Sequence, residues 1–475
     1  MPHRRQRYYL LSLGCAKNTV DSQSMAQLLE GAGLRGTDDP AQAGVLIVNT
    51  CGFIESARQE SIAALNDLAA LKREGQLLIA AGCLSQRVGQ ELARQVPGLD
   101  GVIGTRRWMD IVDLVSRLRQ RRHPEPIYHL PDEALTVGAD ERGTLRAARQ
   151  GASAYLKIAD GCRRPCAFCA IPMIKGTAVS RPLAAILDEA RRLRDDGVKE
   201  LILIAQDLTD YGHDLGLKEG LAQLLEALVR AVPEIPWIRL MYAYPGAVTP
   251  RLIDLMAETP QILPYLDIPL QHGHRDTLLR MRRPANVEWV YRTIEIMRAR
   301  MPDLAIRTTF IVGYPGETEE EFAALLQMVH DLQFDRVGVF TYSYEAGTPS
   351  AALPGQLPEE VKEARRDALM TLQQSISLAR NQAQVGRVLG VLVEGHARAE
   401  DEHGQPLDTI ISVGRSYRDA PEIDGYVVVE GELPVGEIVP VRITGAMTYD
   451  LIGAPELAPG RVIAPGQVYG PGDLA

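Results

Sequence analysis

Apolar and polar positions follow a strand-and-helix rhythm in the N-terminal part of the chain. Short apolar runs at residues 8–14, 44–50 and 76–82 have the length and continuity of buried parallel strands. Between them lie stretches with helical spacing of apolar residues, such as 21–33 and 56–75. This order predicts a doubly wound α/β domain built on a parallel sheet.

The rhythm ends after residues 1–116, which we take as the first domain. Residues 117–153 mix charges, prolines and glycines with little periodicity, which is typical of a linker. Four arginines between residues 117 and 122 suggest a contact with RNA, but acidic residues follow them and no aromatic residues are interspersed. We therefore expect this segment to be a solvated connection.

The alternation resumes in residues 154–386. Helical stretches separate six apolar runs, at residues 154–160, 200–207, 237–244, 265–271, 305–313 and 336–343. Six consecutive strand–helix units predict a partial (β/α)6 barrel of the TIM type, in which functional sites lie at the C-terminal ends of the strands. A long amphipathic helix, residues 357–384, follows the last strand.

Residues 387–475 have the pattern of a small β-domain. Short β-type runs are divided by glycine and proline turns, at residues 386–395, 409–414, 425–431 and 436–446. This pattern predicts a small antiparallel β-barrel. The expected fold is thus α/β, with a parallel sheet, a partial TIM-like barrel and a C-terminal β-barrel in that order.

Composition limits the class of protein. The 475 residues are 46% hydrophobic and 24% charged, as in an ordinary water-soluble protein. No apolar run reaches the roughly 18 residues that cross a membrane, and the basic N-terminus runs directly into a strand pattern rather than a secretory signal. We expect a cytoplasmic protein of about three domains.

Cysteine spacing carries the strongest chemical signal. Cys162, Cys166 and Cys169 form a C-x3-C-x2-C loop just after the first barrel strand. Three thiolates can hold an iron–sulfur cluster and leave one iron without a protein ligand. Structural zinc needs a fourth ligand, and the next histidine, His213, is more than forty residues away. A cluster is therefore favoured over zinc.

Three further cysteines follow three predicted strands. Cys15, Cys51 and Cys83 stand directly behind the first, second and third apolar runs. Since the C-terminal ends of parallel strands meet at one edge of a sheet, these thiols are expected to converge on one crevice. Three separate buried thiols are the alternative, and disulfides are not expected in a large chain without a secretory signal. The pattern favours a second three-cysteine cluster.

The chain as a whole resembles the methylthiotransferases of the radical S-adenosylmethionine (SAM) superfamily. The motifs that carry the resemblance are "LGCAKNTVDS", "NTCGFIESARQES", "GCRRPCAFCAIP", "LIAQDLTDYG", "YLDIPLQH", "TTFIVGYPGETEEEF", "FTYSYEAGTPSA" and "GRSYRDAPEIDG". Within that group the chain resembles the RimO branch, which methylthiolates an aspartate of the twelfth small-subunit ribosomal protein. "GCAKN" and "GFIESA" differ from what the transfer RNA branch shows at these places.

The resemblance implies a detailed chemistry. Cys162, Cys166 and Cys169 would bind a [4Fe–4S] cluster that chelates SAM, whose reduction yields a 5′-deoxyadenosyl radical. Cys15, Cys51 and Cys83 would bind an auxiliary [4Fe–4S] cluster that carries or delivers sulfur. The radical would abstract hydrogen from the β-carbon of the aspartate, and a second SAM would supply the methyl group. The C-terminal barrel would be a TRAM domain.

Residues outside the cysteines give weaker signals. Gln206 and Asp207 end the second barrel strand, and Gly313 and Gly316 follow the fifth, so we expect these four to contact SAM. No catalytic residue beyond the cluster ligands is identified. Three residues have no assigned role: Lys175, which stands where the family usually has arginine, and the H-x-H pair His272 and His274. That pair would more readily line the site than bind a metal.

Charge indicates the kind of partner. Residues 381–475 contain six Arg, no Lys and fourteen acidic residues, so they carry −8 of the total charge of −10. An acidic domain suits a basic ribosomal protein as substrate and argues against direct binding of nucleic acid. An external electron donor and a sulfur source are also expected. The alternatives are a transfer RNA methylthiotransferase and, in another class, an iron–sulfur electron-transfer or redox-sensing protein.

Overall fold

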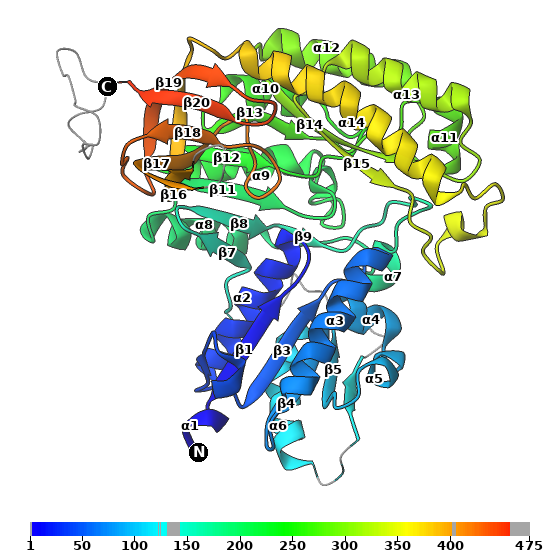
Figure 1. The fold of residues 1–475 in the computed structure, drawn as a ribbon, viewed down its shortest axis with the longest axis vertical. Coiled ribbons are helices and arrows are strands. Elements are labelled where there is room, and N and C mark those ends of the chain that lie inside the picture. The colour runs from blue at the N-terminus through cyan, green and yellow to red at the C-terminus, as the bar shows by residue number, and fades with distance from the viewer. Residues whose placement is uncertain (1, 122, 124, 131–142, 401–404, 457–475) are drawn as a thin grey trace.

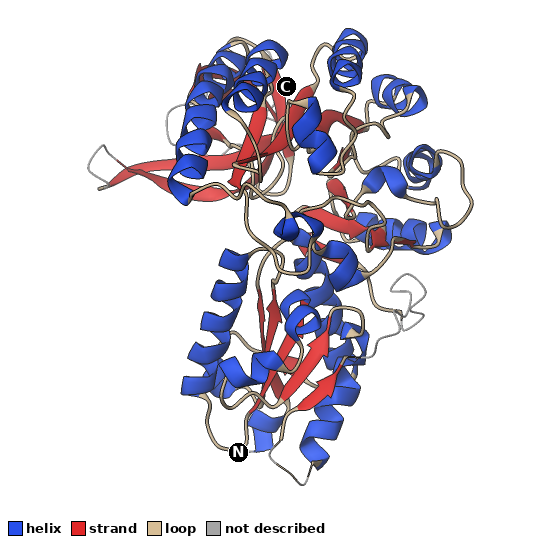
Figure 2. Ribbon diagram, turned by 90° about the vertical axis from the view of Figure 1, so that its right-hand side faces the viewer, coloured by secondary structure: helices blue, strands red, loops and turns tan. Residues whose placement is uncertain are grey.

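The computed structural model describes residues 2–121, 123, 125–130, 143–400 and 405–456. Its three β-structures follow one another along the chain (Figure 1). The view turned by 90° in Figure 2 shows the N-terminal sheet between layers of helices, below the central sheet and its own helices. The predicted fold class is confirmed.

The N-terminal sheet has six parallel strands in the order β2-β1-β3-β4-β5-β6. The strands are β1 (Arg7–Ser12), β2 (Arg35–Gly36), β3 (Val45–Thr50), β4 (Leu77–Gly82), β5 (Gly101–Gly104) and β6 (Ile127–His129). The helices are α1 (Pro2–Arg5), α2 (Ala16–Gly31), α3 (Glu55–Leu71), α4 (Cys83–Val88), α5 (Glu91–Gln95) and α6 (Ile111–Gln120). Every residue of β3 is buried, because helices cover both faces of the sheet.

The central sheet has seven strands in the order β15-β14-β13-β12-β11-β8-β7. The strands are β7 (Ala147–Gln150), β8 (Ser153–Lys157), β11 (Glu200–Ile204), β12 (Trp237–Leu240), β13 (Ile262–Asp267), β14 (Ala305–Val312) and β15 (Arg336–Thr341). Its helices are α7 (Ile171–Lys175), α8 (Leu183–Asp195), α9 (Gly220–Ala231), α10 (Pro250–Glu258), α11 (Arg275–Arg280), α12 (Val287–Arg300), α13 (Glu319–Leu332) and α14 (Glu359–Gln382). A short pair, β9 (Ala159–Asp160) and β10 (Val179–Ser180), stands beside this sheet.

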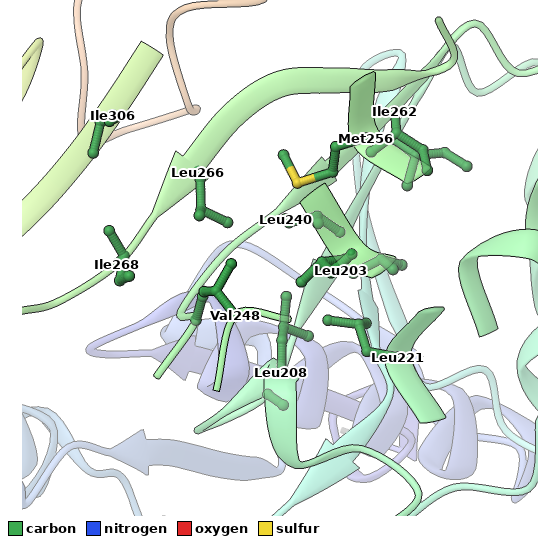
Figure 3. Close-up of a cluster of buried hydrophobic side chains, with 14 of the residues drawn as sticks. Leu203, Leu208, Leu221, Leu240, Val248, Met256, Ile262, Leu266, Ile268 and Ile306 are labelled. Atoms are coloured by element: carbon green, nitrogen blue, oxygen red, sulfur yellow. The ribbon is translucent and has the colours of Figure 1, made fainter. Parts of the chain in front are cut away.

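The six strands β8 and β11 to β15 run parallel and match the six predicted apolar runs. The sheet stays open, as a partial barrel should. Its outer face packs against the helices through one large apolar cluster. In Figure 3, Leu203, Leu240 and Leu266 of three successive strands meet Met256 of α10 in this cluster.

The C-terminal strands form a closed barrel in the order β16-β17-β18-β20-β19. They are β16 (Val388–Glu400), β17 (Pro406–Ser416), β18 (Val427–Glu430), β19 (Ile438–Ala446) and β20 (Leu451–Pro455). The sequence predicted four strands here, and β20 is the fifth. Since an odd number of strands cannot close with every pair antiparallel, one pair, β18 with β20, is parallel.

The segment expected to be a linker contributes to both neighbouring sheets. Within residues 117–153, β6 extends the N-terminal sheet and β7 pairs antiparallel with β8. Residues 131–142 lie outside the described part of the chain. Short edge strands of this kind show little alternation of apolar and polar residues, because they form by hydrogen bonding to a single neighbouring strand.

A buried charged layer joins the C-terminal barrel to the central sheet. Glu200 at the start of β11 binds Arg239 of β12 at 2.7 Å and Arg415 of β17 at 2.6 Å. All three side chains are fully buried. Similar pairs follow along the sheet, Asp335 with Arg418 and Arg336 with Asp419, each at 2.7 Å. The segment 414–425, "GRSYRDAPEIDG", therefore packs against the central sheet and is not a surface loop.

Glu200→Gln tests this joint. Burial alone would raise the pKa of Glu200, but Arg415 and Arg239 outweigh it and lower the pKa to about 2. A carboxylate with a lowered pKa stabilises the fold above its ordinary pKa of 4.5 and loses that contribution as the pH falls toward 2. At neutral pH, Glu200→Gln leaves the buried guanidinium of Arg239 without an anion and Arg415 with Glu394 alone, at a cost of about 3–5 kcal/mol.

The measurement is the midpoint of urea denaturation. Glu200→Gln should lower it clearly at pH 7, and the difference from wild type should shrink below about pH 4. The matched control is Glu437→Gln, which removes an exposed pair with Lys199 and should change stability by less than about 1 kcal/mol. Equal midpoints for the two variants would contradict the role assigned to the joint.

Candidate active site

A cavity of about 440 Å³ lies between the N-terminal sheet and the central sheet. Both sheets turn the C-terminal ends of their strands toward it, as expected for sites in parallel α/β folds. All six cysteines line this one cavity: Cys15, Cys51, Cys83, Cys162, Cys166 and Cys169. The structure thus brings together the two sets that the sequence placed at separate strand ends.

The N-terminal three cysteines lie on three adjacent strand ends. Cys15 is the N-cap of α2, Cys51 follows β3, and Cys83 begins α4 directly after β4. Gly14 allows the close approach, because a Cβ on this residue would stand 3.0 Å from the Cys51 sulfur. With a φ of +89°, this position also favours glycine.

Asn18 holds these strand ends in place. Its side-chain amide donates to the carbonyl of Leu13 at 2.9 Å and to that of Thr50 at 3.1 Å. Its amide oxygen lies 3.6 Å from the sulfur of Cys83. One buried side chain therefore links the ends of β1 and β3 with the thiol behind β4. Asn18 was not among the residues expected from the sequence, where a polar residue one helical turn after Cys15 is its one local signal.

The loop carrying the other three cysteines is fixed at several points. The amide of Cys162 donates to Gly176 at 3.0 Å, and that of Cys169 donates to Cys166 at 3.1 Å. The amide of Ala167 donates to Met281, at the end of α11, at 2.9 Å. The side chain of Cys83 packs against Ala170 and Ile174, so the two cysteine sets meet through α7.

The thiols differ in their ease of ionisation. Burial raises the pKa of Cys83 and of Cys169 to about 12 and that of Cys162 to about 11. Desolvation also acts on Cys15, but the Lys17 ammonium and backbone amides outweigh it and lower the pKa of Cys15 overall. Cys15 therefore ionises more readily than Cys83, Cys162 or Cys169 to the thiolate, the form that binds metal.

A cluster of buried charged side chains lies beside this cavity, and one of its members, Lys175, lines the cavity. Lys175, at the end of α7, binds Asp21 of α2 at 3.1 Å and Asp160 of β9 at 3.0 Å. Lys157 of β8 binds Asp21 at 2.5 Å and Asp160 at 3.2 Å, and Arg146 completes the group. Desolvation opposes the charged forms, yet the neighbouring cations keep the pKa of Asp160 far below its usual range.

Two arginines and a tyrosine form another wall of the cavity. The guanidinium groups of Arg164 and Arg283 lie over the Tyr244 ring, at 4.1 Å and 4.3 Å from its centroid. Nη1 of Arg283 is 3.6 Å from the sulfur of Cys166. Asp207, expected to contact SAM, lines the cavity, but its carboxylate is bound to Arg164 at 2.7 Å and to the amide of Thr209 at 2.9 Å.

Gln206 and Gln271 also line the cavity. In each, the side-chain Oε1 atom is buried and has no hydrogen-bond partner among the described residues. Buried polar atoms are normally paired, so such exceptions require an explanation. Two unpaired amide oxygens on residues that line one cavity fit a polar site whose side chains could turn toward a ligand.

Four sequence candidates are not among the residues that line the cavity. Gly313 and Gly316 have φ angles of +71° and +74° and shape the turn between β14 and α13. His274 is the N-cap of α11 and accepts from the amide of Asp276. His272 is buried and accepts from the amide of His274 at 3.0 Å.

The sulfur atoms are arranged for a group larger than a single ion. Among the described residues, one group of three possible metal-ligand atoms lies within 4.8 Å of one another, and it consists of His274, Asp276 and Glu321. Neither set of three cysteine sulfur atoms is that close together. Zinc–sulfur bonds of about 2.3 Å would need thiolates closer than that. Three thiols around an open space, with no fourth ligand grouped with them in the described part of the chain, fit a cubane cluster with one open iron.

Three known domain families match the chain. The radical SAM superfamily matches residues 156–329, the family described as "Uncharacterized protein family UPF0004" matches residues 7–104, and the TRAM domain matches residues 385–455. Among solved structures, the radical SAM methyltransferase TsrM from Kitasatospora setae shares the fold, with a TM-score of 0.54. It is 16% identical and the alignment covers 85% of this chain and 80% of that one.

Curated relatives are much more similar in sequence. The ribosomal protein uS12 methylthiotransferase RimO of Chloroflexus aurantiacus is 50% identical, over 94% of this chain and 99% of its own. That of Roseiflexus sp. is 47% identical, over 95% and 98% of the two chains, and that of Symbiobacterium thermophilum is 46% identical, over 93% and 90%. With this identity over nearly the whole length, and the cysteine cavity in place, the chain belongs to the RimO family of radical SAM methylthiotransferases.

Proposed function

We propose that the protein adds a methylthio group to the β-carbon of an aspartate in ribosomal protein uS12. Membership of the radical SAM superfamily implies SAM and a [4Fe–4S] cluster, and the names of the relatives specify the substrate. The observation that carries the proposal is the placement of both cysteine sets around one cavity. A donor of sulfur and a generator of radicals can then act on the same atom of one bound substrate.

In this proposal the two cysteine sets hold different groups. Cys162, Cys166 and Cys169 bind the SAM-binding [4Fe–4S] cluster, and Cys15, Cys51 and Cys83 bind a second [4Fe–4S] cluster. When bound, SAM and the clusters supply one-electron chemistry, sulfur and a methyl group. Such chemistry is required because an unactivated C–H bond offers no acidic proton to a general base.

The protein's own residues position these groups and control their surroundings. Asn18 fixes the strand ends that carry the N-terminal cysteines. Arg283 places a positive charge 3.6 Å from the sulfur of Cys166. Gln206 offers an unpaired amide oxygen, so we propose that it contacts SAM, whereas Asp207 acts through Arg164. Gly313 and Gly316 would support the site only through the turn that they form.

The chain's units have separate tasks in this proposal. Residues 1–116 supply the second cluster, residues 154–386 the radical chemistry, and residues 387–475 an acidic domain suited to a basic ribosomal protein. An external electron donor and sulfur source complete the reaction. No helix among the described residues is long and apolar enough to cross a membrane, and we propose a cytoplasmic enzyme.

Iron analysis tests the second cluster. After anaerobic reconstitution the wild-type chain should hold about eight irons and eight sulfides, since each cubane contains about four of each. Replacing Cys15, Cys51 and Cys83 together by alanine should leave about four. The matched control replaces Cys162, Cys166 and Cys169 and should also leave about four. A wild-type content near four would contradict the two-cluster proposal.

Mass spectrometry of reaction products tests the substrate. Incubation with SAM, reductant and sulfide should add one methylthio group to an aspartate of uS12 and none to transfer RNA. The Cys162→Ala variant, which lacks one ligand of the SAM-binding cluster, should give no product on either. Modification of transfer RNA alone would replace the proposal by the transfer RNA alternative, and radical-free electron transfer without product would favour the redox protein.

A further inference from the structure

We propose that Lys17 binds the side-chain carboxylate of the substrate residue and so makes the enzyme select aspartate over asparagine. The inference rests on the proposed function, in which an aspartate enters the cavity. Burying a carboxylate without a cationic partner costs several kcal/mol, so a cavity built for aspartate requires a cationic side chain whose N–H donors the protein does not already use.

Four cationic side chains line the cavity, and three are engaged. Arg164 binds Asp207 at 2.7 Å, and Lys175 binds Asp21 and Asp160. Arg283 donates to the carbonyl of Pro269 and faces the sulfur of Cys166.

Lys17 differs from these three. Within the described parts of the chain its ammonium has neither an acidic partner within 4 Å nor a hydrogen-bond acceptor, although it lines the same cavity. Its ammonium lies 3.3 Å from the centroid of the Tyr242 ring. A contact with a ring face holds the charge in place and leaves N–H donors of the ammonium free for an anion.

The backbone beneath this contact is strained. Tyr242 and Gln271 have φ angles of +70° and +76°, which residues other than glycine rarely adopt. Both follow the ends of neighbouring strands, β12 and β13, and both line the cavity. Strain of this kind persists where function requires it. Here the strained Tyr242 is the residue whose ring contacts the Lys17 ammonium.

The position suits the chemistry. Lys17 comes from the N-terminal domain two residues after Cys15, while Tyr242 comes from the central sheet. A carboxylate bound there is held between the two cysteine sets. In aspartate the carboxyl carbon is bonded directly to the β-carbon, so anchoring the carboxylate also fixes the carbon to be modified. Asparagine has the same shape but lacks the charge.

The test compares binding of two substrates to each of four proteins. The substrates are uS12 and uS12 in which the modified aspartate is replaced by asparagine. The proteins are reconstituted wild type, Lys17→Met, Lys17→Arg and the control Lys218→Met, whose lysine is exposed and remote from the cavity. Dissociation constants are measured without reductant. Because each preference is a ratio within one protein, partial misfolding of a variant does not change it.

Wild type and Lys218→Met should prefer the aspartate form at least about tenfold. Lys17→Met should reduce the preference to about twofold or less by weakening the aspartate form, and Lys17→Arg should retain most of it. SAM also carries a carboxylate, so SAM affinity is measured on the same samples and should be unchanged in Lys17→Met.

A wild-type preference that survives in Lys17→Met would overturn the inference, as would a Lys17→Met loss of SAM affinity with the preference intact. Absence of a preference in wild type would also overturn it, while methylthiolation of uS12 would still support the proposed function. If the wild-type enzyme did not modify uS12, both the proposed function and the role of Lys17 would be contradicted.

Discussion

The site depends on one buried ion cluster. Asp21 belongs to the helix that begins behind Cys15, Asp160 stands two residues before Cys162, and Lys175 ends the helix that follows Cys169. The three residues are at most 8% exposed, and Lys175 binds both carboxylates directly. Because removing one partner would leave uncompensated buried charge, the two cysteine-bearing segments are held in a fixed relation. Both sets can then face one cavity, although they come from different domains.

A second charged layer closes the opposite part of the central sheet. Glu200, Arg239 and Arg415 join the C-terminal barrel to the starts of the strands, whereas the cysteines lie beyond the ends of the strands. The partial barrel is thus covered by α2 on one side and by the segment 414–425 on the other. The C-terminal barrel is therefore joined to the central sheet away from the cysteine cavity.

Much of this arrangement could be predicted from local pattern. Apolar runs gave the parallel strands, and the rule that parallel strand ends converge brought Cys15, Cys51 and Cys83 together. What local pattern could not show depends on distant partners. β20 contains a glycine and a proline among its five residues, so its own sequence does not predict a strand. It is a strand because it pairs with β18 and β19 and thereby closes the barrel. Lys17 has a defined place only because the Tyr242 ring, 225 positions later in the chain, lies beneath it. Contacts of that range leave no periodic signal.

The central claim is that both cysteine sets hold clusters that face one shared cavity. Anomalous X-ray diffraction at the iron edge, from crystals of the anaerobically reconstituted protein, tests it most directly. The account predicts two separate iron peaks in the same cavity, one bound by Cys15, Cys51 and Cys83 and the other by Cys162, Cys166 and Cys169. A single iron peak, or two peaks separated by protein rather than by open cavity, would contradict it.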